Sequence, residues 1–226
     1  METTLEVRWF VRGVPPAVVQ RWFRLECPGK LLEKLDTRKD WYACQQKTFV
    51  DKIGRFSSRA LNRDEVNFKL RQGNPELKLR QQEFGTYGFG HQKRSPSLDA
   101  AQSFICEGKV EQWCKFGEQE LKDPTFTAYD LLSETEWIGI DKERRQKIEQ
   151  GVASELTCLK INNEPWWSIA FELTQNNDDR QQDACFKEVV ERACQTYCGP
   201  KLSATNSYGY SRWLLEFETY INLSSG

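Results

Sequence analysis

The sequence predicts an α+β fold built on a mostly antiparallel β-sheet. The main observation is that apolar and charged residues alternate with a period of two in stretches spread along the chain. Such alternation is typical of strands with one buried face and one polar face. A second observation is that two of these stretches, residues 66–80 and 155–173, are each interrupted by a short turn sequence. Each of them therefore predicts a β-hairpin.

Length and composition limit the functions to be considered. The chain has 226 residues and no long Pro/Ser-rich linker, so we predict one domain over residues 1–226. It carries 32 basic and 33 acidic residues, and its formal net charge of -1 argues against non-specific binding to nucleic acid or to an anionic membrane. No run of 18 apolar residues or secretory signal occurs, so we expect a cytoplasmic protein whose eight cysteines are buried thiols.

The N-terminal part predicts a strand followed by a short helix. Residues 5–12 alternate, with an apolar side and a side that carries Glu6 and Arg8. Two prolines then precede residues 17–26, in which apolar residues recur at helical spacing. Proline suits the first turn of a helix, so this segment predicts an amphipathic helix that packs on the sheet. Residues 41–49 give a weaker strand prediction.

The hairpin at residues 66–80 is the central feature of the sequence. One of its faces is apolar, and the other carries four cations, Lys69, Arg71, Lys78 and Arg80. Like charges that face each other across a β-ladder are destabilising. We therefore expect an anionic group to meet this face. Carboxylates elsewhere in the chain could supply it, or a ligand could.

The segments after this hairpin predict a loop and three further strand regions. Residues 85–97 are rich in turn residues and contain His91, the single histidine, so they predict a surface loop. Residues 109–116 and 136–145 predict strands that carry basic residues, and residues 155–173 predict the second hairpin.

The C-terminal part predicts a long helix and a last strand. The helix is expected from residue 178 to about residue 198, because a buried stripe at helical spacing is followed by Gly199 and Pro200. Residues 212–220 alternate again, with Glu216 and Glu218 on one face. A Glu-x-Glu pair on one face of a sheet can hold a divalent cation through its oxygens.

The charged strand faces have two interpretations. In an antiparallel sheet with one wet side, they would simply form a solvated exterior. If the sheet closed into a barrel, the same charges would line its interior. Ammonium and guanidinium groups there would bind the oxygens of a polyphosphate, and carboxylates would hold Mg²⁺ or Mn²⁺.

The order of these segments resembles the triphosphate tunnel (CYTH) superfamily. The resemblance implies an eight-stranded antiparallel tunnel that processes triphosphate compounds with a divalent metal. The family's opening Glu-x-Glu-x-Lys motif corresponds to Thr4, Glu6 and Arg8, so Thr4 stands in place of a carboxylate. This change removes one metal ligand and argues against hydrolysis. The other matches are the family's basic hairpin, its Lys-x-Arg strand, its mid-chain Glu and its last strand, at Arg71, Lys78, Lys142, Arg144, Glu172, Glu216 and Glu218.

On this resemblance we expect the sheet to curl into a tunnel-like barrel with helices packed outside. The leading functional hypothesis is metal-dependent hydrolysis or binding of a triphosphate-containing small molecule, with Mg²⁺ or Mn²⁺ as cofactor. The alternative is a non-catalytic module of the same fold that binds an anionic ligand or a protein partner. A membrane is not expected as a partner, and nucleic acid is disfavoured because the chain lacks a net basic charge. The predicted phosphate-binding residues are Arg8, Lys69, Arg71, Lys78, Arg80, Lys142 and Arg144; the predicted metal-binding or catalytic residues are Glu6, Glu172, Glu216 and Glu218.

Overall fold

The computed structural model describes residues 2–44, 49–51, 53–54, 60–91, 104–117, 121, 135–175 and 180–224 of the chain. In chain order, the strands of this part are β1 (Glu2–Arg12), β2 (Lys30–Leu31), β3 (Asp36–Ala43), β4 (Val66–Arg71), β5 (Asn74–His91), β6 (Phe104–Phe116), β7 (Trp137–Glu149), β8 (Val152–Ile161) and β9 (Glu164–Gln175). The helices named below are α1 (Ala17–Leu25), α4 (Arg180–Thr196) and α5 (Tyr210–Ser224).

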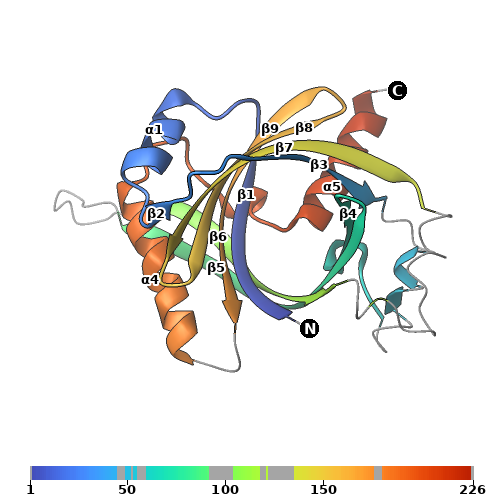
Figure 1. Ribbon diagram of the computed structural model, residues 1–226, viewed down its shortest axis with the longest axis horizontal. Helices are drawn as coiled ribbons and strands as arrows, with labels where there is room; N and C mark the ends of the chain where they lie inside the picture. The colour runs from blue at the N-terminus through green and yellow to red at the C-terminus, as the bar shows by residue number, and fades with distance from the viewer. Residues whose placement is uncertain are drawn as a thin grey trace, which may run out of the picture.

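The described strands form one antiparallel sheet that closes on itself. Their order is β2-β7-β3-β4-β5-β6-β1-β9-β8, and β7 also pairs with β8, so that a ring forms with β2 attached to it. Figure 1 shows α1 and α4 on one side of this ring and α5 on the other. The predicted α+β fold with a curled antiparallel sheet is confirmed.

The ring differs from a strict barrel between β1 and β6. Strand β1 pairs with β6 only from Glu2 to Val7. Beyond that point a C-terminal segment takes over as partner, because Trp9 forms a bridge with Ser207 and the Tyr208 amide donates to the Arg8 carbonyl at 3.0 Å. The chain after α4 is thereby inserted between two strands that would otherwise continue their ladder.

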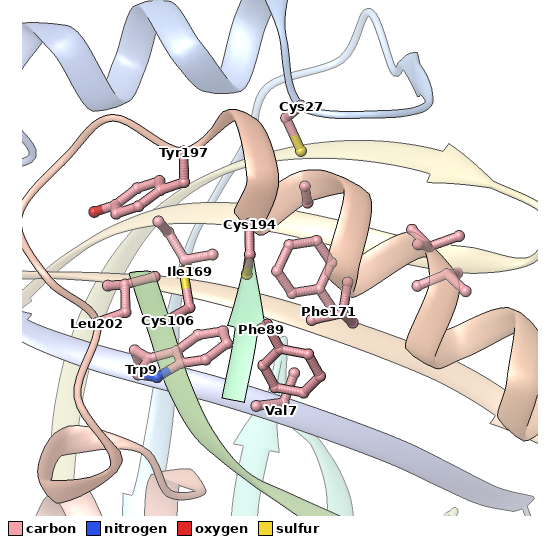
Figure 2. Close-up of a cluster of buried hydrophobic side chains, with 14 of the residues drawn as sticks. Val7, Trp9, Cys27, Phe89, Cys106, Ile169, Phe171, Cys194, Tyr197 and Leu202 are labelled. Atoms are coloured by element: carbon pink, nitrogen blue, oxygen red, sulfur yellow. The ribbon is translucent and has the colours of Figure 1, made fainter. Parts of the chain in front are cut away.

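The apolar face of β1 packs outward against α1 and α4. Val7 and Trp9 belong to a buried cluster together with residues of β5, β6, β9 and both helices. Figure 2 shows this cluster, in which Trp9 and Phe89 lie beside Cys106 and Cys194. The prediction of buried thiols is confirmed for four cysteines, Cys27, Cys106, Cys114 and Cys194. It is wrong for the other four: Cys44, Cys158 and Cys185 are only partly buried, and Cys198, which follows the last turn of α4, is exposed.

The central hairpin has the two unlike faces that its alternation predicts. Val66 and Phe68 of β4 and Leu77 and Leu79 of β5 are buried in a second outer cluster. Along this hairpin, apolar side chains therefore point out of the ring and charged side chains point into it.

The helices predicted over residues 17–26 and 178–198 are observed as α1 and α4, although residues 176–179 lie outside the described part.

Two predictions of secondary structure are wrong. Residues 212–220 belong to helix α5, because Trp213, Leu214 and Phe217 are all buried, at a spacing that suits a helix rather than a strand. Residues 85–91 of the predicted loop belong to β5, whose ladder with β6 runs on through two irregularities to His91. Gly85, at a φ of 96°, lies within the second of these, between Glu83 and Thr86, where a glycine adopts this backbone conformation without strain. The rest of the predicted loop, residues 92–97, lies outside the described part.

Helix α5 packs against one end of the ring interior. Trp213 stacks on Phe10 of β1 with ring centroids 4.7 Å apart, and both side chains are buried. Tyr42, Ile140 and other inward-facing residues complete this aromatic cluster. The helix thus covers apolar positions that lie on the same strand faces as the charged residues. In the described part of the chain, no helix is long and apolar enough to cross a membrane.

Candidate functional site

The charged strand faces enclose a cavity of about 330 Å³ inside the ring. All strands of the ring contribute to it, and Gly209 and Tyr210 close it on the side of α5. Among the described residues its walls carry eight basic and four acidic side chains. The basic ones are Arg8, Arg38, Lys69, Arg71, Lys78, Lys115, Lys142 and Arg144, and the acidic ones are Glu6, Glu76, Glu155 and Glu172.

The structure brings most of the predicted site residues together. Strand alternation explains why, because residues two apart on a strand share one face and this face is the inner one throughout the ring. The predicted residues that line the cavity are Glu6, Arg8, Lys69, Arg71, Lys78, Lys142, Arg144 and Glu172. Of the two interpretations of the charged faces, the enclosed interior is the one observed.

Arg80 lies outside this cavity. It lines a neighbouring pocket, where its guanidinium contacts Glu111 at 2.9 Å and Asp64 at 2.8 Å. Burial raises the pKa of Glu111 to about 7, although the contact with Arg80 opposes this shift. Trp113 lines the charged cavity and donates its indole N–H to Glu111 at 3.1 Å. Arg80 is therefore held by internal carboxylates and does not face the main cavity.

Glu216 and Glu218 are not beside Glu6, contrary to the prediction of a closing strand. Both lie on α5, where Glu216 accepts a hydrogen bond from the Tyr208 hydroxyl at 2.6 Å and Glu218 contacts Arg63 at 3.0 Å. The strand that pairs with β1 on the side away from β6 is β9, and it places Glu172 opposite Glu6. The same register places Thr174 opposite Thr4, so threonines occupy both positions two residues away.

The floor of the cavity is a row of alternating charges. Arg8 is 4 % exposed and contacts Glu6 at 2.6 Å and Glu155 at 3.2 Å. Glu155 also binds Arg144 at 2.7 Å. At the other end of the row, Lys78 of β5 contacts Glu6 at 3.7 Å and Glu172 at 2.9 Å. Side chains from five strands of the ring are linked in this way, and we call this set the charge row: Arg144, Glu155, Arg8, Glu6, Lys78 and Glu172.

Away from the charge row, Arg38 is held by Asp36 and Asp40, whereas Arg71 and Lys115 are paired less tightly. The guanidinium of Arg71 lies 3.7 Å from Glu76 and 4.0 Å from Asp36, and its side chain is 34 % exposed. Lys115 lies 3.9 Å from Glu2 and is 31 % exposed. Lys69 contacts Glu76 at 3.1 Å. These cations are accessible from the cavity and retain hydrogen-bond donors for a ligand.

Lys142 marks the boundary between the charged cavity and the aromatic end. Its ammonium donates to the Tyr42 hydroxyl at 2.6 Å, contacts Asp40 at 3.0 Å, and lies 3.8 Å from the centre of the Tyr210 ring. Burial lowers the pKa of Lys142 to about 7. Burial, together with the neighbouring Lys142, lowers the pKa of Lys69 to about 8. Burial and neighbouring cations thus both oppose the charged forms of these two lysines.

Four charged residues of this site, Arg38, Glu76, Lys115 and Glu155, were not among the predicted ones, and neither was Tyr210. Arg38 and Lys115 come from strands whose charges the sequence did not connect with the hairpin, and Glu155 was seen only as a charged residue within a strand. The alternation around Lys115 and Glu155 was present in the sequence, but the pairing of strands that makes them neighbours is not local. Arg38 lies in a charged segment whose sequence is compatible with a helical turn or a loop and that forms part of β3. Tyr210 gave no signal, because it starts the helix that was predicted as a strand.

The carboxylates of the site do not fit a divalent metal. The register of β6, β1 and β9 places Glu111, Glu6 and Glu172 side by side. However, each already has a basic partner within 3 Å, since Glu111 binds Arg80, Glu6 binds Arg8, and Glu172 binds Lys78. Within the described residues no group of three or more His, Cys, Asp or Glu side chains is placed to hold a metal ion. The predicted Mg²⁺ or Mn²⁺ has no ready ligand set here.

Comparisons with known proteins give matches among solved structures only. No protein-family model matches the chain, and no curated protein matches it. Among solved structures, a conserved hypothetical protein from Pyrococcus furiosus aligns with 92% of this chain and 98% of its own, at 9% identity and a TM-score of 0.44. A protein from Bacillus halodurans described as a "putative adenylate cyclase" aligns with 86% of this chain and 92% of its own, at 14% identity and a TM-score of 0.40.

Proposed function

We propose that this protein binds a small polyphosphate-type anion, such as a triphosphate-containing molecule, inside the charged cavity. One observation carries the proposal. Eight basic and four acidic side chains, counted over the described residues, line a cavity of about 330 Å³. Basic groups remain in the majority even when Asp36 and Asp40, which contact Arg38, Arg144 and Lys142, are included, while the chain as a whole is close to neutral. A folded chain gains nothing from collecting excess cations in an enclosed space unless an anion enters, because enclosed like charges repel each other.

The arrangement of the cations suits several linked phosphate groups. Arg71 and Lys115 are half-buried at the accessible side, and Lys69 and Lys142 lie deeper. Arginine and lysine donors spread over several angstroms can contact successive phosphoryl groups, whereas a single phosphate would reach only part of them. The residues predicted from the sequence to bind phosphate lie on these same walls, Arg80 excepted.

Hydrolysis of the bound anion is the second candidate function. The threonines opposite each other at positions 4 and 174 and the neutralised carboxylates of the charge row weigh against it. Its test is the release of phosphate from tripolyphosphate by the pure protein with Mg²⁺ or Mn²⁺. Release that disappears in the Arg71→Ala variant would make the protein an enzyme; no release under these conditions would rule out hydrolysis of tripolyphosphate.

Calorimetric titration with phosphate, pyrophosphate and tripolyphosphate tests the proposed binding. We expect affinity to rise along this series, and we expect Arg144→Ala to weaken tripolyphosphate binding about tenfold or more. Arg145→Ala is the matched control, because Arg145 is the next residue on β7 and faces an outer groove. If wild-type protein binds none of the three anions, or if both variants lose affinity equally, the proposal is wrong.

A further inference from the structure

The charge row bears on whether the bound anion carries a metal ion, provided that the cavity binds an anion as proposed above. We infer that Arg8 and Lys78 take the place of a divalent cation in this cavity, so that the protein binds its polyanion free of metal. Each of the two residues contacts two carboxylates of the row, Arg8 between Glu155 and Glu6, and Lys78 between Glu6 and Glu172.

Arg8 is built into the wall rather than offered to a ligand. Its guanidinium donates to Glu6 at 2.6 Å, to Glu155 at 3.2 Å and to the Ser168 hydroxyl at 3.4 Å. It also lies 5.0 Å from the centre of the Tyr210 ring. An arginine whose donors are used in this way supplies a fixed positive charge at the carboxylates. A bound metal ion would neutralise the carboxylate charges in the same way.

Lys78 supplies a positive charge to two carboxylates, Glu6 and Glu172. It reaches from β5 past β6 to Glu6 on β1 and Glu172 on β9, which are paired in register. Although burial alone would raise the pKa of Glu6, Arg8 and Lys78 hold it below its ordinary value. Glu6 therefore stays ionised at neutral pH without an added cation, and Glu172 has the Lys78 ammonium as its partner.

The flanking positions do not supply the ligands that a metal would need. Thr4 and Thr174 face each other next to Glu6 and Glu172, and each has a hydroxyl where a carboxylate would give a charged oxygen. The Thr4 hydroxyl is buried and makes no hydrogen bond, and the Thr174 hydroxyl donates to Glu2 at 3.0 Å. A hard divalent cation prefers charged oxygens, and here it would also face the positive charges of Arg8 and Lys78.

The basic side chains of the cavity other than Arg8 and Lys78 bind the anion. No metal ion is required to reduce the repulsion between the anion and the carboxylates of the cavity wall. Phosphate oxygens near Glu6 and Glu172 would meet carboxylates whose charge Arg8 and Lys78 already cancel. Divalent metals in solution also bind polyphosphates, so they compete with the protein for the free anion. The ligand class is therefore a metal-free polyanion, and added Mg²⁺ should weaken the observed binding instead of strengthening it.

Titrating wild-type protein with tripolyphosphate in EDTA and again in millimolar Mg²⁺ or Mn²⁺ tests this inference. We expect tight binding in EDTA and a several-fold loss of apparent affinity with metal, which matches the fall in free anion. Binding that needs metal, or that metal strengthens tenfold, would overturn the inference and leave the proposed function intact. An absence of binding under every condition would overturn both.

Two variants of one residue show whether Lys78 acts as the internal cation. Lys78→Arg keeps the positive charge, and we expect its affinity to fall with Mn²⁺ as in wild type. Lys78→Gln leaves Glu172 without its ammonium partner, and we expect Mn²⁺ to raise the affinity of this variant for tripolyphosphate several-fold. If Mn²⁺ acts identically on both variants, Lys78 does not hold this role. Circular dichroism and a titration with Mn²⁺ alone, followed by electron paramagnetic resonance, provide readouts independent of anion binding.

Discussion

The two ends of the ring interior differ sharply, although the same strands build them. On β1, Glu6 and Arg8 line the charged cavity, and Phe10, two residues further along the same face, stacks on Trp213 of α5. On β7, Lys142 lines the cavity and Ile140 belongs to the aromatic cluster. The inner face of a strand is therefore not polar or apolar as a whole. What a given position contains depends on whether α5 or the cavity lies opposite it.

This difference implies a division of labour between stability and binding. The aromatic end buries large side chains and should contribute most of the stability that the interior provides. The charged cavity holds its ions at a cost in desolvation, which ion pairs offset only in part. Variants at the two ends should therefore affect different measurements.

The largest expected effect is the loss of Trp213 at the aromatic end. Trp213 is fully buried and packs against Phe10, Tyr210 and Trp166. Truncating a buried tryptophan removes apolar contacts and leaves a cavity, so Trp213→Ala should lower the free energy of unfolding by about 3–5 kcal/mol. Urea denaturation measures this change. Trp41→Ala, at a tryptophan that is 43% exposed, serves as control and should cost far less; equal losses would contradict the division of labour.

The next effect concerns the buried carboxylate of the charge row. Glu155→Gln leaves Arg8 and Arg144 without their shared anion and should destabilise the protein by about 3 kcal/mol. Burial alone would raise the pKa of Glu155, but Arg8 and Arg144 lower it to about 2. Because this pKa is below its unfolded value, the stabilisation is present above about pH 4.5 and is lost as the pH falls towards 2. Acid titrations of both proteins should converge at low pH.

A smaller effect is expected for the pH dependence of anion binding. The pKa of Lys142 is about 7 and that of Lys69 about 8, so both lose charge as the pH rises from 6.5 to 9. Without anion, the folded protein holds fewer protons than the unfolded chain in this range, and its stability should rise with pH. A bound anion favours the ammonium forms, so affinity should fall by about tenfold over the range. Calorimetry in buffers of different ionisation enthalpy should detect proton uptake, and affinity independent of pH would contradict this prediction.

The smallest effect is expected at Glu216, which the sequence had placed at a metal site. Its side chain is 41% exposed and binds Tyr208 and Arg212 on its own side of the molecule. Glu216→Gln should leave tripolyphosphate affinity unchanged and alter stability by no more than about 1 kcal/mol. A tenfold change in affinity would show that α5 contributes to the binding site after all.

The candidate site was largely predictable because alternation assigns side chains to faces. Whatever the position of their strand in the fold, Lys69 and Arg71 had to lie on the strand face opposite to that of Phe68. In the same way, Lys142 had to share a strand face with Arg144. The same argument failed for residues 212–220. A run with Trp213, Leu215 and Phe217 on one side satisfies a period of two, but the burial of Leu214 beside Trp213 belongs to a helix.

Neighbours across the ring were beyond the reach of the sequence. Glu155 and Arg8 are 147 positions apart, and Arg144 reaches Glu155 only because β7 pairs with β8. The sequence by itself determined which residues share a strand face, because backbone geometry fixes the side-chain period within each strand. Only the tertiary structure decided that these faces turn inward, that Arg8 and Lys78 are occupied by carboxylates, and that α5 fills one end. The reason is that strand pairing and helix docking depend on contacts between distant segments, which no local period contains.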